Sequence, residues 1–114
     1  MIALPFPAKI LWPNGRTRNV RWRAAEFAKH KGWAHLATLE KLPPCFKHNG
    51  KPIALAYTVH PKTAHRIDAD NAVAAMKAYQ DGIALAMKVD DSAFLTPTIA
   101  FGEPVKGGRI EVTL

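Results

Sequence analysis

The stretch RIDADNAVAAMKAYQDGIALAMKVDD, residues 66–91, decides the fold predicted for this chain. Its apolar residues recur at the spacing of one helix face, at Val73, Met76, Ile83 and Met87. We therefore predict a helix over residues 71–87 that packs this face on a core. The same stretch holds every aspartate of the chain: Asp68, Asp70, Asp81, Asp90 and Asp91. Acidic residues thus lie at both ends of the predicted helix.

Outside this stretch, alternation and turn residues predict four strands and one more helix. Residues 53–60 alternate apolar and small or polar side chains, and residues 109–114 do the same, as half-buried strands do. Residues 2–4 and 94–101 are predicted as shorter or edge strands because prolines follow or interrupt them. A helix is predicted over residues 17–39. The resulting order, βαβαββ, is an α+β fold with two main helices on a mixed β-sheet, in a single domain over residues 1–114.

The helix at residues 17–39 carries a drifting apolar stripe. Val20, Ala24 and Phe27 are spaced for one face, and the stripe continues through residues 33–37. Gly32 leaves open a bend or two shorter helices, because glycine weakens a helix by about 1 kcal/mol relative to alanine. The prolines at positions 43 and 44 are expected to end the helix.

The charge of the chain is strongly basic and unevenly distributed. The net charge is +7 and the pI is near 9.9. Residues 1–66 carry twelve Lys and Arg against only Glu26 and Glu40, an excess of +10. Such an excess favours an anionic polymer as partner. Cys45 is the single cysteine, so no internal disulfide is possible, and no apolar run is long enough for a membrane helix. We expect a cytoplasmic protein with no membrane partner.

The clustered aspartates point to a hard cation. Carboxylates a few ångströms apart repel one another, and Mg²⁺ offsets that repulsion while binding one or two carboxylates and a substrate phosphate. On a continuous helix, Lys77 lies two turns after Asp70, and Asp81 lies one further turn along the same face. This arrangement suggests metal-assisted hydrolysis of a phosphodiester. The alternative is structural: Asp68 or Asp70 caps the helix, and Asp90 begins an ordinary turn.

The remaining candidates are basic or aromatic. Four arginines near a Pro-Asn-Gly turn are expected to contact DNA phosphates: Arg16, Arg18, Arg21 and Arg23. Trp12 and Trp22 alternate with them and are typical of base stacking, although Trp22 is equally consistent with a core position. A zinc site is not expected, because His30 and His35 do not share a helix face and His60 and His65 flank a loop without a cysteine pair.

These motifs resemble the RusA-type Holliday-junction resolvases of bacteria and their phages. The resemblance runs from the Pro-rich opening and Asn14-Gly15-Arg16 to the closing Lys-Gly-Gly-Arg of residues 106–109, with little of it in residues 32–50. Its most specific part is Asp-x-Asp-Asn at residues 68–71, followed by Lys77 and then Asp90-Asp91. In some members the lysine follows the motif more closely, where this chain has Ala74. Lys77 fits the longer-spaced variant of phages and prophages.

The resemblance implies a homodimeric, Mg²⁺-dependent endodeoxyribonuclease that resolves four-way DNA junctions by paired nicks, in DNA recombination and repair. By motif matching, Asp68, Asp70 and Asp91 are the expected metal ligands and catalytic residues, and Lys77 is the expected catalytic lysine. Asn71 and Lys106 join the arginines as expected DNA contacts. Two alternatives stay open: a nuclease for other branched DNA or for RNA, and a non-catalytic DNA-binding module.

Overall fold

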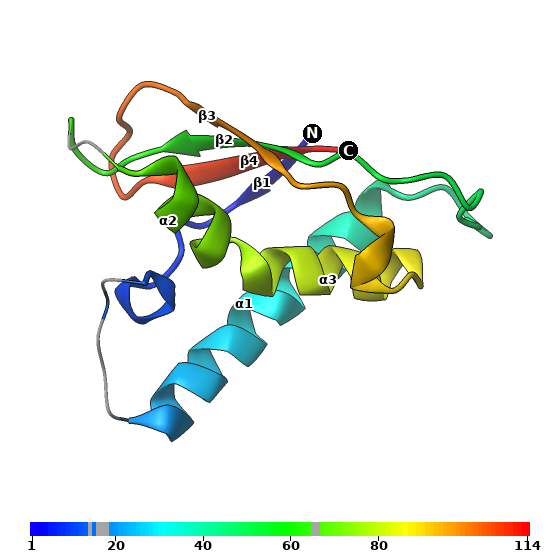
Figure 1. Ribbon diagram of the computed structural model, residues 1–114, viewed down its shortest axis with the longest axis horizontal. Coiled ribbons are helices and arrows are strands. Elements are labelled where there is room, and N and C mark those ends of the chain that lie inside the picture. Colours follow the sequence, from blue (N-terminus) through cyan, green and yellow to red (C-terminus); the bar gives the residue numbers. More distant parts are fainter. Residues whose placement is uncertain (14, 16–18, 65–66) are drawn as a thin grey trace.

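Four strands form one mixed sheet in the computed structural model, which describes residues 1–13, 15, 19–64 and 67–114 (Figure 1). The strands are β1 (Ile2–Leu4), β2 (Ala56–His60), β3 (Thr98–Phe101) and β4 (Arg109–Thr113). Their order in the sheet is β1-β4-β2-β3. Strand β4 runs antiparallel to both of its neighbours, and β2 runs parallel to β3. The predicted mixed sheet is confirmed.

Three α-helices lie together on one side of this sheet (Figure 1). They are α1 (Val20–Lys41), α2 (Ala69–Ala75) and α3 (Lys77–Met87). Two short 3₁₀ helices, η1 (Lys9–Leu11) and η2 (Asp91–Ala93), complete the described elements. The α+β class is confirmed, whereas the expectation of two main helices is wrong: the order is βαβααββ once the 3₁₀ helices are set aside.

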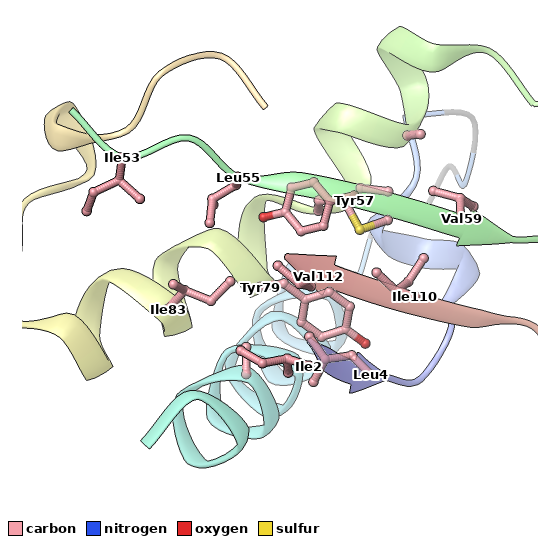
Figure 2. Close-up of a cluster of buried hydrophobic side chains, with 14 of the residues drawn as sticks. Ile2, Leu4, Ile53, Leu55, Tyr57, Val59, Tyr79, Ile83, Ile110 and Val112 are labelled. Atoms are coloured by element: carbon pink, nitrogen blue, oxygen red, sulfur yellow. The ribbon is translucent and has the colours of Figure 1, made fainter. Parts of the chain in front are cut away.

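The core lies between the sheet and the helices (Figure 2). Alternate residues of the two central strands are buried, and the residues between them are intermediate or exposed, as predicted from their period of two. The buried strand residues include Tyr57, Val59, Ile110 and Val112. Tyr79 and Ile83 of α3 meet them from the helical layer (Figure 2). Met76, Ile83 and Met87 are buried as predicted, and Val73 is partly buried.

Helix α1 is continuous through Gly32, so the bend left open by that glycine does not form. Its buried residues are His30, Ala34 and Thr38. The predicted face through Val20 and Ala24 is wrong, because both are exposed: the N-terminal half of α1 extends away from the sheet (Figure 1). The backbone N–H of Trp22 donates to the side chain of Asn19, which caps the helix.

The predicted helix 71–87 is divided at Met76 into α2 and α3. Met76 has φ −83° and ψ −2°, and its N–H lies within hydrogen-bonding distance of the carbonyls of both Ala72 and Val73. The turn is therefore tightened locally, as in a 3₁₀ turn. Lys77 begins a separate helix, so the prediction that it continues the helix of Asp70 is wrong.

Two predicted strands are shorter than expected. Of residues 53–60, only Ala56–His60 form β2, while Ile53 makes an isolated parallel bridge to Phe94. Of residues 94–101, only Thr98–Phe101 form β3, because Pro97 has no N–H to donate to a ladder. The last strand ends at Thr113. Among the described residues, no helix is both long enough and apolar enough to cross a membrane.

Helices α1 and α3 approach each other closely at Gly82. A Cβ atom at this position would lie 2.3 Å from the carbonyl oxygen of Lys31 and 2.9 Å from the Cβ of Ala34. Such contacts are far inside van der Waals distance, and the first involves backbone that cannot rotate away. Glycine is therefore required where the two helices cross.

We predict opposite effects for alanine at two helical glycines. Gly82→Ala forces the helices apart and should lower the free energy of unfolding by about 1–3 kcal/mol or more. Gly32→Ala should raise it by about 0.5–1 kcal/mol, because its Cβ would meet nothing within 4 Å and the helical backbone gains a better helix former. Urea unfolding of both variants measures this. A Gly82→Ala protein as stable as the parent would contradict the close crossing.

Candidate functional site

Lys77 lies between two carboxylates at the start of α3. Its Nζ is 2.9 Å from Oδ1 of Asp81 and 2.8 Å from Oδ2 of Asp91. The first contact is the predicted pairing one turn along the helix. The second joins residues 14 positions apart, from α3 and η2. These two hydrogen bonds, that of Asp91 foremost, raise the pKa of Lys77. The side chain therefore stays a cation well above neutral pH.

The chain reversal after α3 brings Asp91 back to Lys77. Lys88 has left-handed backbone angles (φ 56°, ψ 46°) and ends the helix, and the N–H of Val89 donates to the carbonyl of Ala84. Asp90 then accepts a hydrogen bond from the N–H of Ser92, 3.0 Å away. Hydrogen bonding by the Ser92 side chain, and then by this N–H, lowers the pKa of the Asp90 carboxyl. Asp90 thus holds the turn, as in the structural alternative, and leaves Asp91 to meet the lysine.

The other two predicted metal ligands lie at the opposite end of the acidic stretch. Asp68 occupies the position before the first turn of α2, but its side chain accepts no capping hydrogen bond there. Asp70 is exposed in that first turn. In the part of the chain that the structure describes, no group of three or more His, Cys, Asp or Glu side chains is placed to hold a metal ion. Asp68, Asp70 and Asp91 are therefore not brought together as a complete ligand set.

Asp68 and Asn71 instead line a cavity of about 440 Å³, which we call the loop cavity. Another part of its lining comes from the segment around η1, with Phe6 before that helix and Trp12 just after it. Lys62, in the loop after β2, contributes a third side. The sequence did not identify this cavity, because its walls come from three segments far apart in the chain. The only feature of the sequence that pointed toward it was the run of proline and aromatic residues near the N-terminus, at positions 5–13.

A second cavity, of about 350 Å³, brings together two predicted site residues. Arg23 of α1 and Lys77 of α3 both line it, and Leu11, Phe27 and Val73 form an apolar part of its wall. The Arg23 guanidinium also donates a hydrogen bond to the carbonyl of Ile10. Arg23 thus has a structural contact with η1 beside the predicted catalytic lysine.

The remaining predicted DNA contacts are spread over the surface. Arg21 is exposed near the start of α1, and its neighbour Trp22 is 53% exposed, so Trp22 is not a core residue. Lys106 is exposed in the turn before β4. Arg16 and Arg18 lie outside the described residues.

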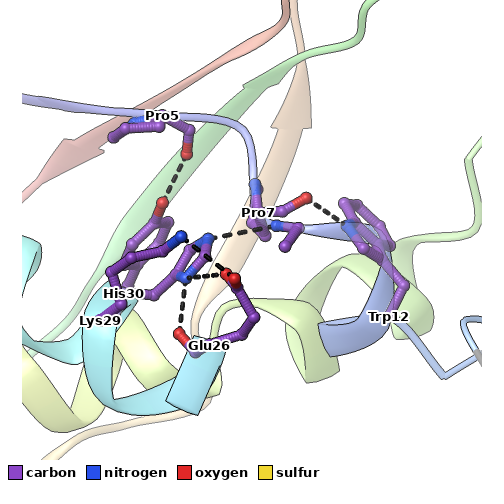
Figure 3. A network of polar contacts seen from close by, with 8 residues as sticks. Pro5, Pro7, Trp12, Glu26, Lys29 and His30 are labelled. Carbon is purple, nitrogen blue, oxygen red and sulfur yellow. Dashed lines mark hydrogen bonds and ion pairs between the residues drawn. The ribbon is translucent and has the colours of Figure 1, made fainter. Parts of the chain in front are cut away.

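His30 fixes the segment that forms one wall of the loop cavity (Figure 3). Its Nδ1 is 2.7 Å from the carbonyl oxygen of Glu26, and its Nε2 is 3.2 Å from the N–H of Ala8. A neutral ring that donates from Nδ1 and accepts at Nε2 satisfies both contacts. Burial lowers the pKa of His30, which keeps the ring neutral. Nearby, the hydroxyl of Tyr79 donates to the carbonyl of Pro5 over 2.5 Å.

The fold and these cavities define a small α+β protein with a lysine–carboxylate cluster and a loop cavity. No known family model matches the chain. The chain is similar to an uncharacterized protein of Xylella fastidiosa, with 30% identity over 122 aligned residues that span 99% of this chain and 74% of the relative. This chain belongs to the same protein family as that Xylella protein.

We predict that stability falls in mildly acidic solution because of His30. The unfolded histidine titrates near pH 6.5, and the folded one at lower pH. The unfolded state therefore binds the proton first, so the stabilisation is complete above pH 6.5 and is lost as the pH falls toward the folded pKa. Urea unfolding between pH 7.5 and 5.5 should show this fall. His30→Gln should lose about 1–3 kcal/mol at pH 7.5 and show a smaller fall; an equal fall in both proteins would contradict the assignment.

Proposed function

We propose that this chain is a Mg²⁺-dependent endodeoxyribonuclease that cuts branched DNA, resolving four-way junctions by paired symmetric nicks in recombination and repair. The observation that carries the proposal is the contact of Lys77 with Asp91. The sequence motif includes both residues, and the Lys77 Nζ lies 2.8 Å from Oδ2 of Asp91 after the chain reversal that follows α3. A cation held by carboxylates beside an open surface suits a site that handles phosphate charge.

In the proposed reaction, a water oxygen bonds to phosphorus, one P–O bond to a deoxyribose oxygen breaks, and a proton passes to that oxygen. Negative charge develops on the phosphate oxygens as this happens. The Lys77 ammonium, which stays protonated at neutral pH, is placed to offset that charge. Arg23 lines the same cavity and adds a second positive charge.

The donor chemistry of the acidic stretch fits Mg²⁺, although the described geometry supplies only part of a ligand set. Mg²⁺ prefers carboxylate oxygen, keeps several waters and is often held by one or two carboxylates with a substrate phosphate. Asp68 and Asp70 are exposed carboxylates that could bind Mg²⁺ in this way. Asp91 would become a third ligand only if its ion pair with Lys77 broke. The ion, when bound, would supply Lewis-acid polarisation and a more acidic water.

The partners follow from the proposed activity. The excess of Lys and Arg in residues 1–66 supports DNA binding, with Arg21 and Lys106 exposed for phosphate contact. Two symmetric cuts need two active sites, so we propose a homodimer. Exposed apolar side chains on α1, among them Trp22 and Leu36, provide surface that a second copy would cover.

A second candidate is a non-catalytic DNA-binding module. It is favoured by the finding that no three His, Cys, Asp or Glu side chains among the described residues form a ligand group. This candidate leaves unexplained why all five aspartates lie in one stretch of a basic protein.

We predict that cleavage of a synthetic four-way junction requires Mg²⁺ and Asp91. Asp91→Asn, Asp70→Asn and Lys77→Met should each lower the nicking rate by roughly 100-fold or more, as loss of a charged group at a transition state does. EDTA should abolish nicking. Gel analysis of end-labelled junctions measures the rates and shows whether the nicks are paired.

The matched control is Asp90→Asn, which makes the same substitution, aspartate to asparagine, at the position next to Asp91. Asparagine can still accept from the N–H of Ser92, so nicking should stay within about three-fold of the parent. Tight junction binding without nicking, in the parent and under any divalent metal, would favour the binding module. Equal cutting of linear duplex and junction would contradict the preference for branched DNA.

A further inference from the structure

We propose that the loop cavity is a binding site for one unstacked nucleotide, in which the base lies against Phe6 and the phosphate meets lysine. This inference rests on the proposed function and deepens it, because the cavity also contains Asp68, one of the expected metal ligands. Its volume of about 440 Å³ lies in the range of small-ligand sites.

The apolar side of the cavity is flat and aromatic. Phe6 stacks on Trp12 with ring centroids 5.2 Å apart and an interplanar angle of 18°. Trp12 is buried, and its indole N–H already donates to the carbonyl of Pro7 over 3.1 Å. It therefore contributes ring surface and no free donor. A planar ligand suits such a wall, because all four nucleobases can stack on aromatic side chains.

The polar side of the cavity suits the rest of a nucleotide. Lys9 and Lys62 are exposed, and the Lys62 ammonium lies over the Phe6 ring, 5.6 Å from its centroid, so a base that stacks on Phe6 would displace this ammonium toward the phosphate. The two ammonium groups match a phosphate. The half-buried amide of Asn71 can both donate to and accept from the edge of a base.

The aromatic wall is held in place before any ligand binds. Tyr79 and His30 fix the backbone at Pro5 and Ala8 by hydrogen bonds. Gly108 packs so closely on Phe6 that a Cβ there would lie 2.7 Å from the ring. A preformed wall loses little conformational entropy on binding, which favours affinity.

A base that is still stacked and paired in a duplex cannot reach this wall. Entry requires a base that is unpaired, as in single strands, or one extruded at the cost of its stacking. Branch points provide such bases more readily than uniform duplex does. The cavity thus gives a physical reason for a preference for branched or single-stranded DNA that does not depend on recognition of a base sequence.

The test is binding in EDTA, where cleavage is absent and failure of the nuclease proposal cannot interfere. The probe is a single-stranded deoxyoligonucleotide of ten residues with one central 2-aminopurine, compared with the same strand in duplex and with an abasic residue at the centre. Fluorescence quenching and anisotropy report stacking and affinity. We expect quenching of the single strand, and affinity at least roughly ten-fold weaker for the duplex and the abasic strand.

Two variants locate the effect in the cavity. Phe6→Leu removes the aromatic face, and Thr63→Trp fills the cavity from an exposed lining position; each should weaken binding by roughly ten-fold. Phe101→Leu and Thr113→Trp make the same changes at exposed positions outside the cavity and should leave affinity unchanged. Thr63→Trp keeps the test valid if Phe6→Leu does not fold.

Affinity unchanged in Thr63→Trp, or equal binding of the abasic strand, would overturn the cavity proposal and leave the nuclease proposal intact. If the parent protein does not nick junctions but still quenches the 2-aminopurine strand, and Thr63→Trp weakens this binding, the nuclease proposal would be overturned and the cavity proposal would stand. Absence of binding to every oligonucleotide would overturn both.

Discussion

The close crossing of α1 and α3 at Gly82 is the constraint on which the rest of the structure depends. It sets Lys31 and Ala34 of α1 directly against α3. His30, the residue before Lys31, and Tyr79, three residues before Gly82, lie beside this crossing, and their rings are 5.6 Å apart. Both then face the N-terminal segment and hold its backbone by hydrogen bonds. A wider crossing would separate these two anchors, so the wall of the loop cavity depends on the absence of one methyl group.

The five aspartates share one stretch of sequence but have different roles in the structure. Asp90 stabilises a turn, and Asp81 pairs with Lys77 along one helix. Asp91 reaches the same lysine from the next element, while Asp68, just before α2, lines the loop cavity. Proximity in sequence therefore does not by itself bring these carboxylates together in space. Lys77 neutralises part of the acidic charge that, from sequence alone, required a cation.

Local patterns predicted the parts of this fold that depend on local physics. The alternation of Ile110 and Val112 places them in the core because a strand has a period of two, and the pairing of Lys77 with Asp81 follows from the helical repeat. The break at Met76 was missed because its neighbours are good helix formers, and only tertiary packing distinguishes one helix from two. The contact of Lys77 with Asp91 depends on the left-handed turn at Lys88, which lysine rarely adopts.

The loop cavity shows why the site itself was harder to predict than the fold. Phe6 and Trp12 come from the basic first half of the chain, whereas Asp68 and Asn71 come from the acidic stretch. Neither of these two segments supplies both the flat aromatic wall and the polar groups that line the cavity with it. Only the packing of the N-terminal segment onto α1 and α3 brings them to one opening. A nucleotide, planar on one side and anionic on the other, would match the aromatic wall and the lysines at this opening, and this combined match is more selective than net charge, which would attract any polyanion.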